Sequence, residues 1–361
     1  MQPKTTHVGS LPRPGNLSAN NIDEAILNVV KMQVEAGLDE VNDGEYRRSI
    51  FFGDLSGLSG FRQHAFPISA SAGDQVMVPV VEGRIQYDPS SPILEKEVRG
   101  IREALEKLGA RRRVKVTIPS LSWMSIFYPD PRTMPTRDEG FIGKQAVVVR
   151  EFYPTLDDYL DDMKKIIINE VRAAIEAGAD TVQLDSPDLL QFDVYGQYLN
   201  VKDKERLKFA IGINNEVLEG LPHERIQVHS CWGNLINTQF NTIGHYEQAL
   251  PELYELKTGT IGPLEVFDGI RDFDELRFFG DYPVPKGKLI ALGIVSVKTR
   301  NVEPVEVIRK RYEAATGVVD EDRLIISPGC GFASDLNNIH SIESARRKLT
   351  NMVLALNQQE K

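Results

Sequence analysis

The chain has 361 residues with an ordinary globular composition, 41% hydrophobic and 26% charged, and its two cysteines exclude a disulfide-rich scaffold. Its 42 basic and 52 acidic residues give a formal net charge of −10, which opposes binding to nucleic acids and to anionic membrane surfaces. The first residues contain no apolar stretch, and no run of about 18 apolar residues occurs. We therefore expect a cytoplasmic protein without a signal peptide or a membrane-spanning helix.

Short apolar runs alternate with longer amphipathic stretches along the chain, which is the pattern of parallel strands joined by helices. We predict eight strands, at residues 5–8, 38–42, 114–118, 181–184, 226–228, 262–266, 289–293 and 324–326. The clearest helices, 22–35, 156–176 and 305–315, are each followed two residues later by a glycine. This pattern predicts an α/β fold, a (β/α)8 TIM barrel, which we expect to form one catalytic domain over residues 1–361.

Two segments depart from this alternation. Residues 76–81 and 84–87 are rich in β-formers and flank Glu82 and Gly83, which predicts a hairpin turn. We place this hairpin in a lobe inserted after the second strand, at about residues 60–90. A long connection, 127–153, follows the third strand on the barrel face where active-site loops lie.

Polar side chains follow the carboxyl ends of the predicted strands, the face on which barrel enzymes carry their active sites. These side chains include Ser10, Glu45, Trp123, Asp185, His229, Glu265, Lys298 and Cys330. Some have simple structural alternatives: Glu45 and Asp185 can cap turns or helices, and Trp123 can pack over the barrel end. Lys298 can be a surface lysine, an anion clamp or a Schiff-base amine.

The most specific signal is a set of metal-binding residue types. His229 and Cys231 alternate at the end of the fifth strand, so their side chains point the same way, and Cys330 lies in a glycine turn after the eighth strand. One imidazole and two thiolates form a donor set that selects zinc. The sequence therefore predicts a zinc site at the carboxyl end of the barrel.

A tetrahedral zinc site needs a fourth ligand. Glu265, at the end of the sixth strand, is the candidate, and Glu252 and Glu255 are rivals on a helical stretch before that strand. The residues alone leave two other interpretations open. The histidine and cysteines can be buried core residues without a metal, or the two cysteines can form a disulfide.

Five segments carry recognisable motifs: residues 5–12 (TTHVGSLP), 43–46 (DGEY), 183–187 (QLDSP), 229–231 (HSC) and 328–331 (PGCG). In order and approximate spacing they resemble the C-terminal catalytic barrel of cobalamin-independent methionine synthase and its stand-alone relatives, over nearly the whole chain. The resemblance implies a catalytic zinc that activates a thiol for attack on a methyl carbon carried by a folate or a corrinoid. The implied ligands are His229, Cys231, Glu265 and Cys330.

The resemblance also implies roles on the substrate side. Ser10, Glu45 and Asp185 would hold the thiol amino acid, with the two carboxylates facing its α-ammonium group. Trp123 matches the family's pterin-stacking tryptophan. Two thiolates and a carboxylate make an electron-rich zinc site that keeps a bound sulfur nucleophilic, whereas hydrolytic sites favour neutral ligands. We therefore predict zinc-dependent transfer of a methyl group to a thiol such as homocysteine.

Three departures from the family bear on the methyl donor. The full-length synthase has an additional N-terminal half that helps to build the folate site and is absent from these 361 residues. The family's aspartate and catalytic histidine after the seventh strand correspond to Ser296 and Lys298, and its glutamate after the fourth-strand aspartate corresponds to Ser186. A lysine is a weaker acid than histidine at neutral pH, so we expect poor turnover of methyl-folate, with a methyl-corrinoid protein as the alternative donor. We expect Lys298 to bind an anionic group or a developing alkoxide.

Other functions compete with methyl transfer. An epoxide:thiol alkyltransferase of the coenzyme M type would use Lys298, Arg300, or the pair Arg47 and Arg48, to bind a sulfonate or the opening oxygen. A lyase would use Lys298 as a Schiff base, and a non-catalytic barrel would keep a closed structural zinc site. The sequence leaves open the alkyl donor, the natural thiol and whether the chain forms oligomers.

Overall fold

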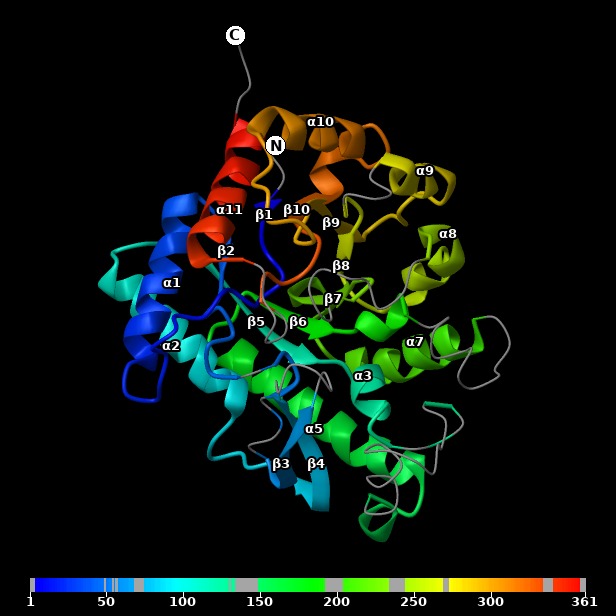
Figure 1. Cartoon of the computed structure of the whole chain (residues 1–361). Coiled ribbons are helices and arrows are strands. Elements are labelled where there is room, and N and C mark those ends of the chain that lie inside the picture. Colours follow the sequence, from blue (N-terminus) through cyan, green and yellow to red (C-terminus); the bar gives the residue numbers. More distant parts are fainter. Residues whose placement is uncertain are drawn as a thin grey trace.

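The computed structural model describes residues 4–48, 50–53, 55, 58–67, 75–128, 130, 132–133, 149–191, 204–233, 244–268, 273–333 and 340–357, with the side chains of all but 63–67 and 75–79. Eight parallel strands form one sheet in the order β1-β10-β9-β8-β7-β6-β5-β2. They are β1 (Lys4–Thr5), β2 (Glu40–Val41), β5 (Arg113–Pro119), β6 (Thr181–Asp185), β7 (Ile226–Ser230), β8 (Thr260–Glu265), β9 (Leu289–Val295) and β10 (Leu324–Pro328). Each overlaps a predicted strand, and helices surround the sheet (Figure 1), so the predicted (β/α)8 barrel is confirmed.

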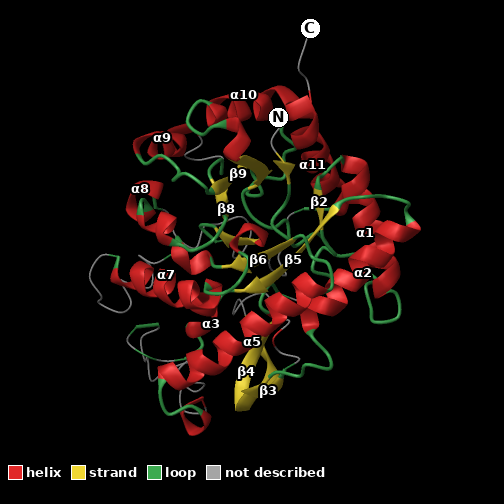
Figure 2. Cartoon of the chain, turned by 180° about the vertical axis from the view of Figure 1, so that it is seen from behind, coloured by secondary structure: helices red, strands yellow, loops and turns green. Residues whose placement is uncertain are grey.

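Helices cover the outside of the barrel, as the view from behind shows (Figure 2). They are α1 (Ile22–Ala36), α2 (Ile93–Lys107), α3 (Leu121–Ser125), α5 (Leu156–Glu176), α7 (Glu205–Leu218), α8 (Tyr246–Ala249), α9 (Phe273–Asp281), α10 (Val305–Thr316) and α11 (Ile342–Asn357), with short 3-10 helices η2 (Pro187–Leu189), η3 (His223–Arg225), η4 (Glu252–Glu255) and η5 (Glu321–Arg323). The three helices predicted from the sequence are confirmed as α1, α5 and α10. In α5, Met163, Ile167 and Val171 repeat every four residues and are fully buried, which is the spacing that turns one helix face to the core. None of the described helices is both long and apolar enough to cross a bilayer.

Side chains join β1 to β2, where the described backbone forms no strand ladder. The Asp39 carboxylate accepts hydrogen bonds from the backbone N–H of Thr5 at 2.8 Å and from its hydroxyl at 2.9 Å. Further along the seam, the Gln33 amide bonds both backbone groups of Asn42, and its oxygen also accepts from the ring of His7 at 2.8 Å. Polar side chains therefore complete the nearly closed barrel.

The segment between β2 and α2 contains an antiparallel pair, β3 (Ser59–Pro67) and β4 (Gln75–Gln86). The predicted turn at Glu82 and Gly83 is wrong, because 76–81 and most of 84–87 belong to the single strand β4. These two residues lie instead at an irregularity in register, since Ser59 pairs with Gln86 but Phe61 pairs with Val81. The extent of the predicted inserted lobe at 60–90 stays a prediction, and most of the long loop over 127–153 lies outside the described residues.

Candidate metal centre and substrate site

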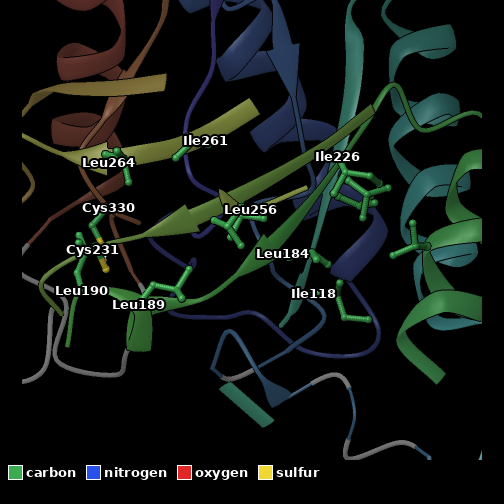
Figure 3. Close-up of a cluster of buried hydrophobic side chains, with 14 of the residues drawn as sticks. Ile118, Leu184, Leu189, Leu190, Ile226, Cys231, Leu256, Ile261, Leu264 and Cys330 are labelled. Carbon is green, nitrogen blue, oxygen red and sulfur yellow. Dashed lines mark hydrogen bonds between the residues drawn. The ribbon is translucent and has the colours of Figure 1, made fainter. Parts of the chain in front are cut away.

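The carboxyl ends of β7 and β10 bring the predicted histidine and cysteines together. One ligand atom each of His229, Cys231 and Cys330 lies within 4.8 Å of the others, and all three side chains are buried. The two Sγ atoms are 3.4 Å apart, which is longer than a disulfide bond, and both cysteines are free. This structure therefore does not contain the disulfide that the sequence left open. Figure 3 shows Cys231 and Cys330 side by side.

Hydrogen bonding and charge around these three residues fit a cation. The Nδ1 atom of His229 donates to the Pro263 carbonyl at 2.6 Å, which leaves Nε2 for the hydrogen bond with Cys330 and as the available ligand atom. Zinc-binding histidines commonly donate their other ring N–H to a carbonyl in this way. The contact with Cys231 and burial together raise the pKa of the Cys330 thiol well above its usual value. A divalent cation at this position would supply the positive charge that two adjacent thiolates require. The donor set and its surroundings thus fit a zinc ion.

Glu265 lies beside this group but faces a different partner. Its carboxylate is fully buried at the end of β8, 3.5 Å from the Lys298 ammonium, and accepts from the backbone N–H of Trp232 at 3.3 Å. The group of ligand atoms within 4.8 Å does not extend to Glu265, so its role as a fourth ligand stays a prediction. Both rivals lie on η4, where Glu252 pairs with Lys204 at 2.8 Å.

Two glycines allow the ends of β8, β9 and β10 to pack closely. A Cβ on Gly329 would lie 2.8 Å from Cγ of Glu265, and a Cβ on Gly293 would lie 2.2 Å from Cα of Gly329. Side chains at these positions would therefore push the turn that carries Cys330 away from β8. This contact explains the glycine before Cys330 in the PGCG motif.

Two carboxylates from other strand ends form the second part of the site. Oε1 of Glu45 accepts from the Thr117 hydroxyl at 3.1 Å and lies 3.6 Å from the Arg48 guanidinium, while its buried Oε2 has no hydrogen-bond partner in the described chain. Asp185 accepts from Gln183 through Oδ1 at 2.6 Å, and its buried Oδ2 is likewise without a partner among the described residues. Burial raises the pKa of Asp185 to about 6, with His229 opposing and Glu45 adding to the shift. Two buried carboxylate oxygens are therefore available to a positively charged group.

Ser10 and Trp123 are the two other residues predicted for the substrate side of the site, and neither role is tested by their contacts. The backbone carbonyl of Ser10 accepts from the N–H of Phe332 at 3.0 Å, which joins the segment after β1 to the segment after Cys330. The half-buried ring of Trp123 contacts Phe51 and Phe52, with ring centroids 5.1 and 6.0 Å away. The packing alternative for Trp123 is therefore present, and ligand stacking stays a prediction.

The four basic residues considered for anion binding lie in different places and do not form one cluster. Lys298 is buried, and its ammonium donates to the carbonyl of Gly233 as well as facing Glu265. Arg48 is also buried, next to Glu45. Arg47 pairs with Asp23 at 2.8 Å on the surface, and Arg300 is exposed. Lys298 is thus the only one of these four that lies beside the predicted metal ligands.

Three polar residues inside the barrel were not anticipated from the sequence. Lys115, Gln183 and Gln227 lie on β5, β6 and β7 and are fully buried, and Lys115 and Gln227 both donate to Gln183. The signal was available in part, because a lysine and two glutamines interrupt apolar runs that were predicted to be buried strands. Their connection to Asp185 needed the register of the strands.

Comparison with known proteins agrees with this arrangement. Residues 143–358 match the family model described as "Cobalamin-independent synthase, Catalytic domain". The uncharacterized protein YxjH of Bacillus subtilis is 28% identical, over 97% of this chain and 93% of its own length, and a methionine synthase of Sulfolobus acidocaldarius is 24% identical over 97% and 90%. The structure of a B12-independent methionine synthase from Shewanella, in complex with selenomethionine, covers 98% of this chain and 96% of its own with a TM-score of 0.69 at 20% identity, which supports the barrel fold.

Proposed function

Because this chain belongs to the family of the cobalamin-independent synthase catalytic domain, we propose that it transfers a methyl group to a zinc-bound thiol, with homocysteine as the thiol. The observation that carries the proposal is the buried group of His229, Cys231 and Cys330, with ligand atoms within 4.8 Å of one another. Relatives over nearly the full chain are described as methionine synthases, which supports the same reaction.

The proposed metal is zinc. His229 through Nε2, together with Cys231 and Cys330, would hold it, and Glu265 is the proposed fourth ligand. When bound, zinc stabilises the deprotonated sulfur of an incoming thiol and so provides a nucleophile at neutral pH. The Pro263 carbonyl fixes the orientation of the imidazole, which keeps Nε2 directed toward the site.

The proposed amino-acid subsite consists of Glu45 and Asp185, with Ser10 at its edge. Each carboxylate has one buried oxygen without a hydrogen-bond partner in the described chain, and an α-ammonium group would satisfy both. Arg48 and Thr117 both contact Oε1 of Glu45, so the carboxylate does not need to reorganise when a ligand binds to Oε2. Asp185→Asn and Glu45→Gln should accordingly weaken the binding of an amino-acid thiol more than the binding of a simple thiol.

Lys298 distinguishes this chain from the methionine synthase pattern. It stands where the resemblance places a catalytic histidine, and its ammonium lies 3.5 Å from Glu265. We propose that Lys298 binds an anionic group of the substrate or a developing negative charge, and that the donor is a methyl-corrinoid protein in preference to methyl-folate. Trp123 is proposed to contact the donor.

The experiment is a panel of thiols and donors with purified, zinc-loaded enzyme. Homocysteine and coenzyme M are each combined with methylcobalamin, methyl-folate and an epoxide, and products are identified by mass spectrometry. Methionine from homocysteine and methylcobalamin is the expected product, and Cys330→Ser should abolish it and lower the zinc content. Ser230→Ala, at the end of β7, where strand alternation turns its side chain away from those of His229 and Cys231, is the control and should retain zinc. Alkylation of coenzyme M by the epoxide, with no methionine, would contradict the proposal.

A further inference from the structure

A buried lysine lies inside the barrel, below the proposed amino-acid subsite. Lys115 on β5 is 1% exposed, although lysine side chains seldom lie fully inside a protein. Its ammonium donates to the Thr6 hydroxyl at 2.9 Å, to the His7 carbonyl and to Oε1 of Gln183 at 3.2 Å. Three donors thus meet three acceptors, so the ammonium group is fully satisfied.

Gln183 connects this lysine to Asp185. Its Oε1 faces Lys115, and its Nε2 donates to Oδ1 of Asp185 at 2.6 Å and to the Val8 carbonyl at 2.9 Å. An ammonium can donate but cannot accept, so the oxygen of the Gln183 amide must face Lys115. The NH2 group is then forced toward Asp185, which accepts from it and keeps Oδ2 free.

The Val8 carbonyl can only accept, so it favours the same orientation of the Gln183 amide as Lys115 does, whereas the remaining neighbour, Gln227, cannot impose it. Gln227 donates to Oε1 of Gln183 at 2.6 Å, but a glutamine amide can turn over and accept instead. Without Lys115, only the contacts of the Gln183 NH2 group with the Val8 carbonyl and with Asp185 would oppose a joint turn of both amides, which would present the Gln183 oxygen to these two acceptors. Two facing oxygens repel, so the aspartate would have to move or hold a proton between them.

We propose that Lys115 is a positioning residue for substrate binding. By fixing the Gln183 amide, it holds Asp185 as a hydrogen-bond acceptor whose second oxygen receives the α-ammonium group of the thiol substrate. The inference rests on the proposed function, because it assumes an amino-acid thiol. It adds a residue that touches neither the substrate nor the metal.

The sign of the effect separates this role from simple electrostatics. Lys115 is a positive charge near the ammonium subsite, so its charge alone would weaken binding, and Lys115→Met would strengthen it. In the proposed relay, Lys115 acts on Asp185 through Gln183, and its loss should instead weaken the binding of homocysteine. The test measures dissociation constants of zinc-loaded enzyme by calorimetry for homocysteine and for 4-mercaptobutyrate, which has the same thiol and carboxylate but lacks the ammonium group.

We expect Lys115→Met to raise the Kd of homocysteine about tenfold and to leave that of 4-mercaptobutyrate within about twofold. In an Asp185→Asn background, no carboxylate remains at position 185 to be oriented. There, adding Lys115→Met should raise the Kd of homocysteine by less than about twofold. If Lys115→Met does not fold, Gln183→Leu removes the same bridge and should produce the same selective loss.

Equal losses for the two ligands, tighter homocysteine binding, or an unchanged preference would each contradict the relay while leaving the proposed function standing. Failure of the wild-type enzyme to prefer homocysteine over 4-mercaptobutyrate would contradict the proposed function, and the relay with it.

Discussion

At the scale of single residues, Glu45 adopts a backbone conformation that few side chains tolerate. Its φ is 60°, and Arg13 donates to the carbonyls of Glu45 and Arg48 at 3.0 and 2.6 Å, which holds the turn in place. The chain also makes room for its carboxylate, because a Cβ on Gly9 would lie 2.1 Å from Oε1 of Glu45. The unusual backbone conformation of Glu45 and the room left by Gly9 thus both occur where we place the substrate.

Gly9→Ala should displace the Glu45 carboxylate and raise the Kd of homocysteine about tenfold, with little loss of folding stability. Gly15→Ala is the matched control, since a Cβ at Gly15 would meet nothing within 4 Å. Calorimetric titration of both variants measures the difference. Equal affinities for the two variants would show that Glu45 does not contact the ligand.

Glu97 is a buried acid with no hydrogen-bond partner for either carboxyl oxygen in the described chain. Burial raises its pKa from 4.5 to about 8, with Asp43 and Glu45 adding to the shift and Arg48 and Arg47 opposing it. Between these pH values the unfolded chain releases a proton that the folded chain keeps, so the free energy of unfolding falls as the pH rises and levels off above about 8. Between pH 5 and 8, the free energy of unfolding of Glu97→Gln should therefore fall by about 3 kcal/mol less than that of the wild type.

Urea unfolding at several pH values measures this slope. The matched control is Glu103→Gln, an exposed position on the same helix, which should leave the pH profile parallel to the wild type's. Parallel profiles for Glu97→Gln and wild type would contradict the assignment of a buried, protonated carboxyl group.

At the scale of elements, the seam between β1 and β2 depends on side chains. Asp39→Ala removes two acceptor contacts to Thr5, one of them to its backbone N–H, and should lower the free energy of unfolding by about 1–3 kcal/mol. Hydrogen exchange at the Thr5 N–H should accelerate more than at other strands. Asp281→Ala, at an exposed position at the end of α9, is the control and should change stability by less than about 0.5 kcal/mol. Unchanged exchange at Thr5 would mean that the seam closes in another way.

The elements differ in how far the sequence predicts them. The barrel strands are short apolar runs between amphipathic helices, and this local contrast is strong enough to locate all eight. The pair β3 and β4 was harder, because Glu82 and Gly83 have the composition of a turn but lie in a register irregularity of one strand. Composition alone does not separate a turn from a bulge, and the partner strand decides between them.

At the scale of the whole molecule, the predicted zinc ligands come from distant parts of the chain. Cys231 and Cys330 follow different strands, so zinc can bind tightly only when the barrel is closed. Zinc at about 100 times its Kd should stabilise the wild-type fold by about 2.7 kcal/mol, and Cys330→Ser should lose most of this gain. Thermal unfolding with and without zinc measures both values. An equal gain in the variant would place the metal elsewhere.

The candidate site was predictable from the sequence because strand order in a (β/α)8 barrel brings successive carboxyl ends to one face. This rule grouped His229, Cys231 and Cys330 correctly. It could not show that Glu265 faces Lys298, nor that Gln183 links Lys115 to Asp185, since these contacts depend on side-chain directions and register that residue types do not encode.

The measurement that tests the central claim most directly is X-ray absorption at the zinc edge, which counts the sulfur atoms bound to the metal. Zinc-loaded enzyme should show two sulfur neighbours at about 2.3 Å, from Cys231 and Cys330. Saturating homocysteine should raise this count to three, because the substrate thiol joins the two cysteines. A count of two that homocysteine does not change, or zinc without sulfur neighbours, would contradict the account.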